Sequence, residues 1–382
     1  MGKRRIVPEE LEIGSILSWD AYDERGRLLL RKGYVVDRNS QIQALIERGL
    51  FVEQDPGGAA PPPPPPSSPP KPEPTAVSTL LEVRHRLEIL GAPNGPRDNF
   101  SQQILGLRRL VAQACRLNQD IALAVALLEH QARYSIRHSV DVAVVCEAVG
   151  AAVGIEEPQL SSIVAAALTM NISILPLQDD LQGQQNPLSE RQRELINRHP
   201  ETSAALLRER GVVDGVWLDA VLCHHEAIDG TGYPGRKQGD QISLGAQLVS
   251  LADVYCARIS NRVYRRGLRP NAALRALFLD QGKKVPEALI NRFIKAIGVF
   301  PPGTPVRLEN GEIAVVTQRG ENAGKPQVCS IVGPRGMPFA VPIRRDTRRP
   351  TFGVREVVEW NDIGTAMPAM QALWGKAAAP TE

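Results

Sequence analysis

The stretch from Cys223 to Pro234 carries the residue types best suited to chemistry. Two adjacent histidines, His224 and His225, precede Glu226 and a glycine-rich loop that ends at Pro234. Neighbouring residues on a helix point about 100° apart, so two adjacent imidazoles can face two metal ions, or one ion and one phosphate group. The glycines allow a sharp turn and a close approach of the backbone to a ligand. The spacing therefore predicts a metal or phosphate site at a helix-to-loop junction.

This stretch and its continuation resemble one family of bacterial proteins. The chain reads His224-His225-Glu-x-x-Asp-Gly-x-Gly-Tyr-Pro, and later Ile242-Ser-Leu-Gly-Ala, Leu251-Ala-Asp-Val-Tyr and Arg262-x-Tyr264-Arg265. These phrases resemble the HD-GYP family of phosphohydrolases associated with cyclic di-GMP. The resemblance covers about residues 134–299. It implies a multi-helix HD-type bundle in which metal ions assist the hydrolysis of a phosphodiester.

The resemblance also implies a set of metal ligands and a loop at the mouth of the pocket. The residues at the ligand positions of the family are His138, His199, His224, His225 and Asp253. The loop that shapes the pocket and contacts partner domains corresponds to Asp229, Gly230, Gly232, Tyr233 and Pro234. In the family, two or three ions polarise phosphoryl oxygens and turn a bound water into hydroxide. The alternative is that these imidazoles are hydrogen-bonded relics inside a helical bundle.

The pair of residues that gives the family its name is replaced. Where the family reads Ala-Ala-Leu-x-His-Asp-Ile-Gly-Lys, this chain has Met170, Asn171 and Ile174 at the histidine, aspartate and lysine positions. A carboxamide brings no charge to bridge two dications, and a thioether is a soft donor poorly matched to Mn²⁺ or Fe²⁺. Isoleucine removes a cation that would face a substrate phosphate. The remaining nitrogen and oxygen ligands suffice for a single Fe²⁺, Mn²⁺ or Zn²⁺ ion.

These observations leave three hypotheses for the function. The preferred one is a catalytically weak or inactive HD-GYP module in cyclic di-GMP signalling. It would bind cyclic di-GMP or a related nucleotide, or a protein partner through the loop around Tyr233. The second is an active metal-dependent phosphodiesterase that hydrolyses cyclic di-GMP with an atypical metal site. The third is a helical scaffold that binds no ligand.

Composition narrows the class of protein. The chain of 382 residues is long enough for two or three domains, and its net charge of +3 is too small to indicate nucleic-acid binding. No apolar run reaches the roughly 18 residues of a membrane span, and no apolar signal core follows Met1. The five cysteines are scattered without a Cys-x-x-Cys pair, which favours reduced thiols. We expect a cytoplasmic protein without a membrane span.

The hydrophobic pattern predicts a mainly α fold with small β-containing ends. A capping box of Ser189 and Gln192 predicts a helix that ends near Arg198, and the Asn310-Gly311 turn between apolar runs predicts a β-hairpin. We expect a small N-terminal α/β domain at 6–54, a proline-rich linker at 55–76, a helical HD-GYP-like domain at 77–300, a small β domain at 301–360 and a flexible tail at 361–382.

Two further segments have open interpretations. Eleven of the 31 prolines lie between Pro56 and Pro74, which predicts a polyproline II spacer; docking of a proline-recognising partner is the alternative. The basic residues Arg344, Arg345, Arg348 and Arg349 form either a solvated surface or a phosphate-binding patch.

Overall fold

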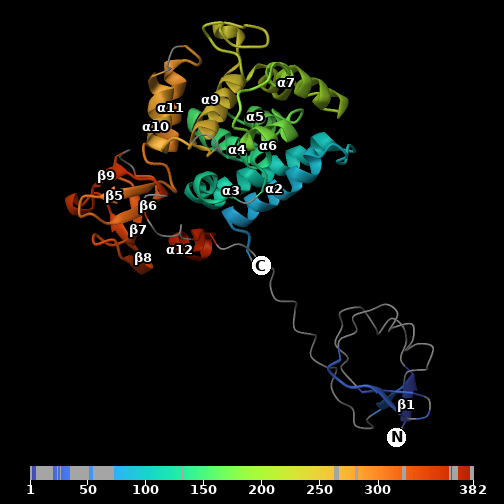
Figure 1. The fold of residues 1–382 in the computed structure, drawn as a ribbon. Coiled ribbons are helices and arrows are strands. Elements are labelled where there is room, and N and C mark those ends of the chain that lie inside the picture. Colours follow the sequence, from blue (N-terminus) through green and yellow to red (C-terminus); the bar gives the residue numbers. More distant parts are fainter. Residues whose placement is uncertain are drawn as a thin grey trace. The chain divides into compact units, whose positions relative to one another are not determined.

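The computed structural model divides the chain into two compact units, Met1–Lys71 and Pro72–Glu382, which are described separately (Figure 1). The helix expected between Ser40 and Arg48, most of the proline-rich linker and the Arg262-x-Tyr264-Arg265 phrase lie outside the described residues. The described residues are 2–5, 20–23, 25, 27–34, 51–54, 73–130, 132–261, 266–279, 283–320, 324–360, 363 and 369–378. Across these ranges, no helix is long and apolar enough to cross a membrane.

The first unit contains a four-stranded antiparallel sheet with the strand order β1-β4-β2-β3. Its strands are β1 (Gly2–Arg5), β2 (Ala21–Tyr22), β3 (Leu28–Leu30) and β4 (Phe51–Gln54). The carboxylate of Asp23 accepts hydrogen bonds from the backbone N–H groups of Arg25 and Arg27, both at 2.9 Å, and so closes the turn between β2 and β3.

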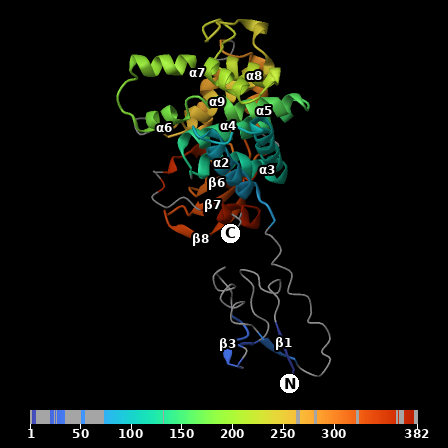
Figure 2. The same cartoon turned by 90° about the vertical axis from the view of Figure 1, so that its right-hand side faces the viewer.

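The second unit is a helical bundle with a small sheet, which confirms the predicted fold class (Figures 1 and 2). The helices of the bundle are α2 (Ala76–Gly91), α3 (Phe100–Leu128), α4 (Tyr134–Val153), α5 (Gln159–Thr169), α6 (Leu175–Gly183), α7 (Glu190–Glu209), α8 (Gly215–Cys223), α9 (Leu244–Ile259), α10 (Pro270–Leu279) and α11 (Glu287–Ile297).

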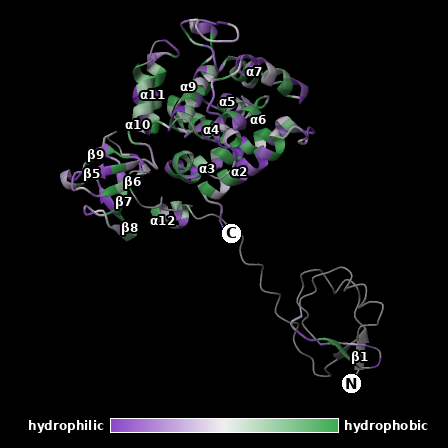
Figure 3. Ribbon diagram, in the orientation of Figure 1, coloured by the Kyte–Doolittle hydropathy of each residue, from purple (hydrophilic) through white to green (hydrophobic). Residues whose placement is uncertain are grey.

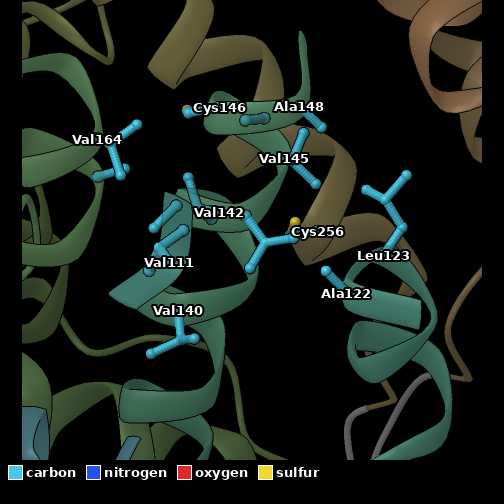
Figure 4. Close-up of a cluster of buried hydrophobic side chains, with 14 of the residues drawn as sticks. Val111, Ala122, Leu123, Val140, Val142, Val145, Cys146, Ala148, Val164 and Cys256 are labelled. Carbon is cyan, nitrogen blue, oxygen red and sulfur yellow. The ribbon is translucent and has the colours of Figure 1, made fainter. Parts of the chain in front are cut away.

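Helix α4 lies at the centre of the bundle, where it packs against α3, α5, α9 and α11. It is apolar on nearly every face, and a helix hydrophobic all round must be buried. Its residues from Val140 to Cys146 are all buried, and Figure 4 shows several of them beside Val164 of α5 and Cys256 of α9. Outer helices such as α11 carry both hydrophobic and hydrophilic residues (Figure 3). The central position of α4 gives any side chain on it a fixed place.

Helix α7 starts as predicted but ends later. The Ser189 side chain accepts a hydrogen bond from the backbone N–H of Gln192, and the Gln192 side chain returns one to Ser189, which forms the capping box. The prediction of an end near Arg198 is wrong, because α7 continues through Pro200 to Glu209. Proline removes one helical hydrogen bond and disfavours the helix interior, but burial of Ser203, Ala204 and Leu207 holds the second half in place.

A five-stranded antiparallel sheet with the order β8-β7-β6-β5-β9 follows the bundle. Its strands are β5 (Pro305–Leu308), β6 (Ile313–Gln318), β7 (Gln327–Val332), β8 (Pro338–Asp346) and β9 (Val354–Val357). The hairpin predicted around Asn310-Gly311 joins β5 to β6, and Gly311 adopts a positive φ of 87° that favours glycine. Strand β6 contacts α3, so the sheet packs on the bundle.

The chain beyond residue 361 differs from the flexible tail that we expected. Its described part contains helix α12 (Met370–Trp374), in which Met370 and Leu373 are buried. The indole Nε1–H of Trp374 donates a hydrogen bond to the carbonyl of Thr317 on β6 at 2.9 Å. The few apolar residues of this segment bury against the sheet, which a composition-based argument could not foresee.

Part of the basic patch is structural. The Arg345 guanidinium donates to both carboxylate oxygens of Glu312, at 2.8 and 2.9 Å, and lies over the Phe352 ring. Ser330 donates a third hydrogen bond to Glu312 at 2.6 Å. Burial raises the pKa of Glu312, but these hydrogen bonds and the Arg345 charge outweigh it, so the net pKa is below the ordinary value.

We expect Glu312→Gln to destabilise the protein at neutral pH. Loss of the charge at a buried, hydrogen-bonded site should cost about 1–3 kcal/mol. Because the folded-state pKa is lowered, this stabilisation is present above the pKa of the unfolded state and is lost as the pH falls through the folded-state value. The difference in unfolding free energy between parent and variant should therefore shrink below about pH 4.3. Denaturant unfolding at several pH values measures it, and a difference independent of pH would contradict the assignment.

Candidate functional site

A cavity of about 480 Å³ lies inside the helical bundle. Its walls come from α4, α6, α7 and α9 and from the loops that follow α6 and α8. The predicted ligands His138, His199, His225 and Asp253 all line it, and so does Tyr233 of the predicted loop. Cavities of this size are typical of small-molecule sites. Three helices, α4, α7 and α9, and the loop after α8 thus bring the predicted residues to one place.

Three of the four predicted histidine ligands form a tight cluster. The ligand atoms of His199, His224 and His225 all lie within 4.8 Å of one another, and no other metal-binding group of three or more such side chains occurs in the described part of the chain. His199 comes from α7, and His224 and His225 follow the last residue of α8. His199 and His224 are buried.

The hydrogen bonds of two imidazoles leave two bare nitrogen atoms facing each other. The Nδ1 atom of His199 lies 2.5 Å from the carbonyl oxygen of Ile196, and that of His224 lies 2.7 Å from the carbonyl oxygen of Val221. A carbonyl only accepts, so each Nδ1 carries the proton and donates it. The two Nε2 atoms, 3.1 Å apart, then carry lone pairs in the neutral form. Two lone pairs at this distance repel unless a cation lies beside both.

The carbonyls of Ile196 and Val221 can accept from the imidazoles because neither has a backbone partner within its helix. Pro200 has no N–H group, so the carbonyl of Ile196 four residues earlier has no helical partner. Val221 lies in the last turn of α8, where carbonyls also lack helical partners. The His-Pro dipeptide and the helix end therefore fix both imidazoles in the same tautomer. This role of Pro200 was not predicted, although a proline's lack of an N–H group follows from the sequence alone.

Burial keeps the three imidazoles neutral. It lowers the pKa of His199 to about 3, with a further contribution from His224. Burial likewise lowers the pKa of His224 and, more strongly, that of His225. A proton is therefore a poor occupant of the space between the nitrogens. Neutral imidazole is the form that binds Zn²⁺, Fe²⁺ and related dications, so the donor set fits a divalent metal ion.

His138 and Asp253 form a separate pair in the same cavity. The Nε2 atom of His138 lies 2.7 Å from a carboxylate oxygen of Asp253, and the buried Nδ1 atom has no hydrogen-bond partner in the described structure. The His138 ring stacks on Tyr134 with centroids 5.5 Å apart. Burial raises the pKa of Asp253, but the hydrogen bond from His138 and the nearby imidazoles outweigh it and hold the pKa well below its usual range. The five predicted ligands thus divide into a cluster and a pair.

The glycine-rich loop is held beside the cluster by Glu226. Its buried carboxylate accepts hydrogen bonds from the backbone N–H groups of Gly235 and Lys237, at 2.5 and 3.0 Å. The Tyr233 backbone N–H donates to the carbonyl of His225 at 3.1 Å, and the two rings stack with centroids 4.8 Å apart. A Cβ atom on Gly232 would lie 2.4 Å from the Ala227 nitrogen, so only glycine fits this close backbone approach.

Other predicted loop residues shape the turn. Asp229 is exposed, and its carboxylate accepts from the Thr231 backbone N–H at 3.0 Å and from the Thr231 hydroxyl at 2.6 Å. Gly230 has a φ of 78°. These residues stabilise the loop, and Tyr233 is the loop side chain that lines the cavity together with its neighbour His225.

The three residues that replace the family's histidine, aspartate and lysine lie in different surroundings. Met170 is fully buried within the hydrophobic core, whereas Asn171 and Ile174 line the cavity. Asp253 is the only acidic side chain among the described residues that line it. The carboxylate count around this cavity is therefore low for a site with several dications.

Parts of this chain are similar to known proteins. Residues 117–288 match the model of the HD domain family. The cyclic di-GMP phosphodiesterase PA4108 of Pseudomonas aeruginosa is 28% identical over 321 residues, which cover 78% of this chain and 77% of the relative. The cyclic di-GMP phosphodiesterase PdeB of Borreliella burgdorferi is 27% identical over 202 residues, 53% of each chain. The solved structure of Bd1817, an HDG"Y"P protein of Bdellovibrio bacteriovorus, has a TM-score of 0.48 at 16% identity and covers 77% of this chain and 99% of that one.

The matched bundle with its buried histidine cluster defines the class of protein as an HD domain, and HD domains are metal-dependent phosphohydrolases. Within this class, the phrase from His224 to Pro234 and the relatives named cyclic di-GMP phosphodiesterases support the predicted resemblance to the HD-GYP family.

The role of Pro200 gives a testable prediction. In Pro200→Ala the new N–H group should bond to the Ile196 carbonyl and compete with His199 for it. Metal affinity should fall about 10- to 100-fold, as for other lost partners of a ligating histidine. The helix should become more stable, because an interior proline costs about 3 kcal/mol. Metal titration and thermal unfolding of the same variant measure both effects. Glu201→Ala, an exposed neighbour on α7, is the control, and equal metal affinity in both variants would refute this role.

Proposed function

We propose that the protein binds one divalent metal ion through His199, His224 and His225, and binds cyclic di-GMP in the adjoining cavity. We further propose that it is a catalytically weak or inactive member of the HD-GYP family. The observation that carries the metal assignment is the 3.1 Å separation of two unprotonated, buried Nε2 atoms, which calls for a cation between them.

The choice of nucleotide is supported by the relatives and the cavity. Proteins that match most or half of this chain are named cyclic di-GMP phosphodiesterases. The cavity of about 480 Å³ adjoins the histidine cluster, and its rings and aliphatic side chains offer apolar surface for bases. The exposed Asp229 and Thr231 of the neighbouring loop leave this edge accessible to a protein partner as well.

The residues of the cavity suggest how a phosphate would be held. A divalent ion on the three imidazoles would polarise a phosphate oxygen when bound. Asp253 accepts from His138 and holds the proton on Nε2, so this pair fixes the His138 ring at the cavity wall. Tyr233 covers one side of His225 and limits the access of water to it.

Two features support weak or absent hydrolysis. Two dications about 3.5–4 Å apart need a bridging negative charge, and Asn171 offers none at the family's bridging position. Asp253, the one acidic group among the described cavity residues, is engaged by His138 at 2.7 Å. One ion can bind a nucleotide phosphate, but the second ion that the family uses lacks an obvious carboxylate.

The test combines metal analysis, binding and turnover on the full chain. Protein purified without oxygen and loaded with Fe²⁺ or Mn²⁺ should contain about one ion per chain and bind cyclic di-GMP with little or no linear product. Hydrolysis that disappears in His224→Ala would establish instead the active, atypical phosphodiesterase. Absence of both metal and nucleotide would overturn the proposal in favour of a scaffold. The variant carrying Met170→His, Asn171→Asp and Ile174→Lys should gain metal if the positions correspond.

A further inference from the structure

A second cavity, of about 330 Å³, lies between the helical bundle and the C-terminal sheet. Its walls come from the ends of α3 and α9, from α4, from the start of α10 and from the chain around Pro305 and Val358. Gln182 on α6 is the one described residue that lines both cavities, and no residue of the histidine cluster lines the second. Its volume lies within the range of small-molecule sites. The second cavity is therefore a separate place at which a small ligand can bind.

The second cavity carries positive charge. Arg137, Arg266 and Arg269 line it, and Glu359 is the only acidic side chain among its described lining residues. The Glu359 carboxylate lies 3.2 Å from Nη1 of Arg266 and 3.5 Å from Nε of Arg269. Three cations and one anion leave an excess of two positive charges. A phosphate monoester carries about two negative charges at neutral pH, so it matches this excess.

Arg137 has hydrogen-bond donors to offer a ligand. Its guanidinium donates one hydrogen bond within the described structure, to the backbone carbonyl of His130 at 3.1 Å. A guanidinium has five N–H groups in a planar fork that matches two phosphate oxygens. Arg137 precedes His138, and adjacent residues of a helix point about 100° apart, so α4 directs one side chain to each cavity.

The backbone that carries the other two arginines is fixed against the end of α9. The N–H of Gly267 donates to the Asn261 side chain at 2.9 Å. A Cβ atom on Gly267 would lie 2.1 Å from the Ile259 carbonyl oxygen, so only glycine permits this close approach. Arg266 and Arg269 on either side of this contact therefore have defined positions at the cavity wall.

An aromatic residue and aliphatic side chains form another part of the wall. Trp360 follows Glu359 directly, and Leu127, Ile259 and Leu268 also line the cavity. Nucleobases stack on aromatic side chains, and stacking tolerates any base because each base has a π-face. The wall thus offers apolar surface for a planar ring beside the arginines that suit a phosphate.

We propose that the second cavity binds a nucleoside monophosphate, with the phosphate on Arg137, Arg266 and Arg269 and the base against Trp360. This site needs no metal ion. It lies outside the proposed cyclic di-GMP cavity, so its occupancy is independent of the proposed function.

Calorimetric titration of the metal-loaded full chain with adenosine 5′-monophosphate, adenosine and inorganic phosphate tests the proposal. The monophosphate should bind at least about 10-fold more tightly than adenosine or inorganic phosphate, because it alone carries both parts. The same titration after treatment with a metal chelator should give an unchanged affinity. Binding that disappears with the metal would place the ligand on the histidine cluster and overturn the proposal.

Two arginine variants test the phosphate contacts. Arg137→Gln and Arg269→Gln should each weaken binding of the monophosphate about 10-fold and leave the metal content unchanged. Arg191→Gln changes an exposed residue of α7 outside both cavities and should keep the parent's affinity. Circular dichroism checks that all three variants are folded.

Other outcomes would also overturn the proposal. If the monophosphate does not bind, or binds no more tightly than adenosine, the arginines do not hold its phosphate. Inorganic phosphate that binds as tightly as the monophosphate would contradict the role of Trp360. Folded Arg137→Gln and Arg269→Gln proteins with the parent's affinity would place the ligand elsewhere. None of these results bears on cyclic di-GMP binding, which the earlier experiment tests.

Discussion

Replacing His224 with alanine should remove the divalent metal ion from the protein. Its Nε2 atom lies 3.1 Å from that of His199, and it is the fully buried member of the histidine cluster. Loss of the hydrogen-bond partner of a ligating histidine typically lowers metal affinity 10- to 100-fold. Loss of the ligating histidine itself should therefore lower it at least about 100-fold. Inductively coupled plasma mass spectrometry of purified protein, and titration with a metal chelator, measure the loss.

Two further variants test whether misfolding explains the loss of metal in His224→Ala. His225→Ala removes a cluster member at the cavity surface and should lose metal to a similar extent. His85→Ala removes an exposed histidine of α2 and should retain the parent's metal content. Circular dichroism of all three reports the helical content. A His224→Ala protein that is folded and fully metallated would contradict the ligand assignment.

Replacing Asp141 with alanine should cause the largest loss of stability among these substitutions. Asp141 on α4 accepts from the Arg84 guanidinium of α2 at 3.0 Å, and the side chain of Arg84 is only 1% exposed. Removing the carboxylate takes away the negative charge that Asp141 places beside this buried guanidinium. Breaking a buried ion pair in this way costs about 3–5 kcal/mol. Denaturant unfolding followed by circular dichroism gives the unfolding free energy.

The chain offers a matched surface pair for comparison. Glu82 and Arg86 form an ion pair at 3.2 Å on the exposed side of the same helix α2. Glu82→Ala should change the unfolding free energy by less than about 1 kcal/mol, because water already solvates both charges. The double variant Arg84→Met with Asp141→Leu should recover most of the stability, since both charges of this pair are then removed. Equal effects of Asp141→Ala and Glu82→Ala would refute the role of burial.

Local sequence signals predicted much of the secondary structure. The capping box at Ser189 and the Asn310-Gly311 hairpin turn both occur where expected, because each motif satisfies its hydrogen bonds within a few residues. The end of α7 was predicted wrongly near Arg198, because burial of the turn after Pro200 outweighs the local preference of proline. The helix near Met370 was missed for the same reason: its apolar residues bury against a sheet distant in sequence.

The sequence by itself determined the resemblance to the HD-GYP family, the mainly helical class and the residue types of the candidate site, since motif residues and hydrophobic periodicity are properties of the chain. Only the tertiary structure decided how those residues divide. It gathered His199, His224 and His225 into one cluster, committed Asp253 to His138 and buried Met170 in the core. The reason is physical: distances between side chains on different helices, and the tautomers set by free carbonyls, depend on packing and do not follow from spacing along the chain.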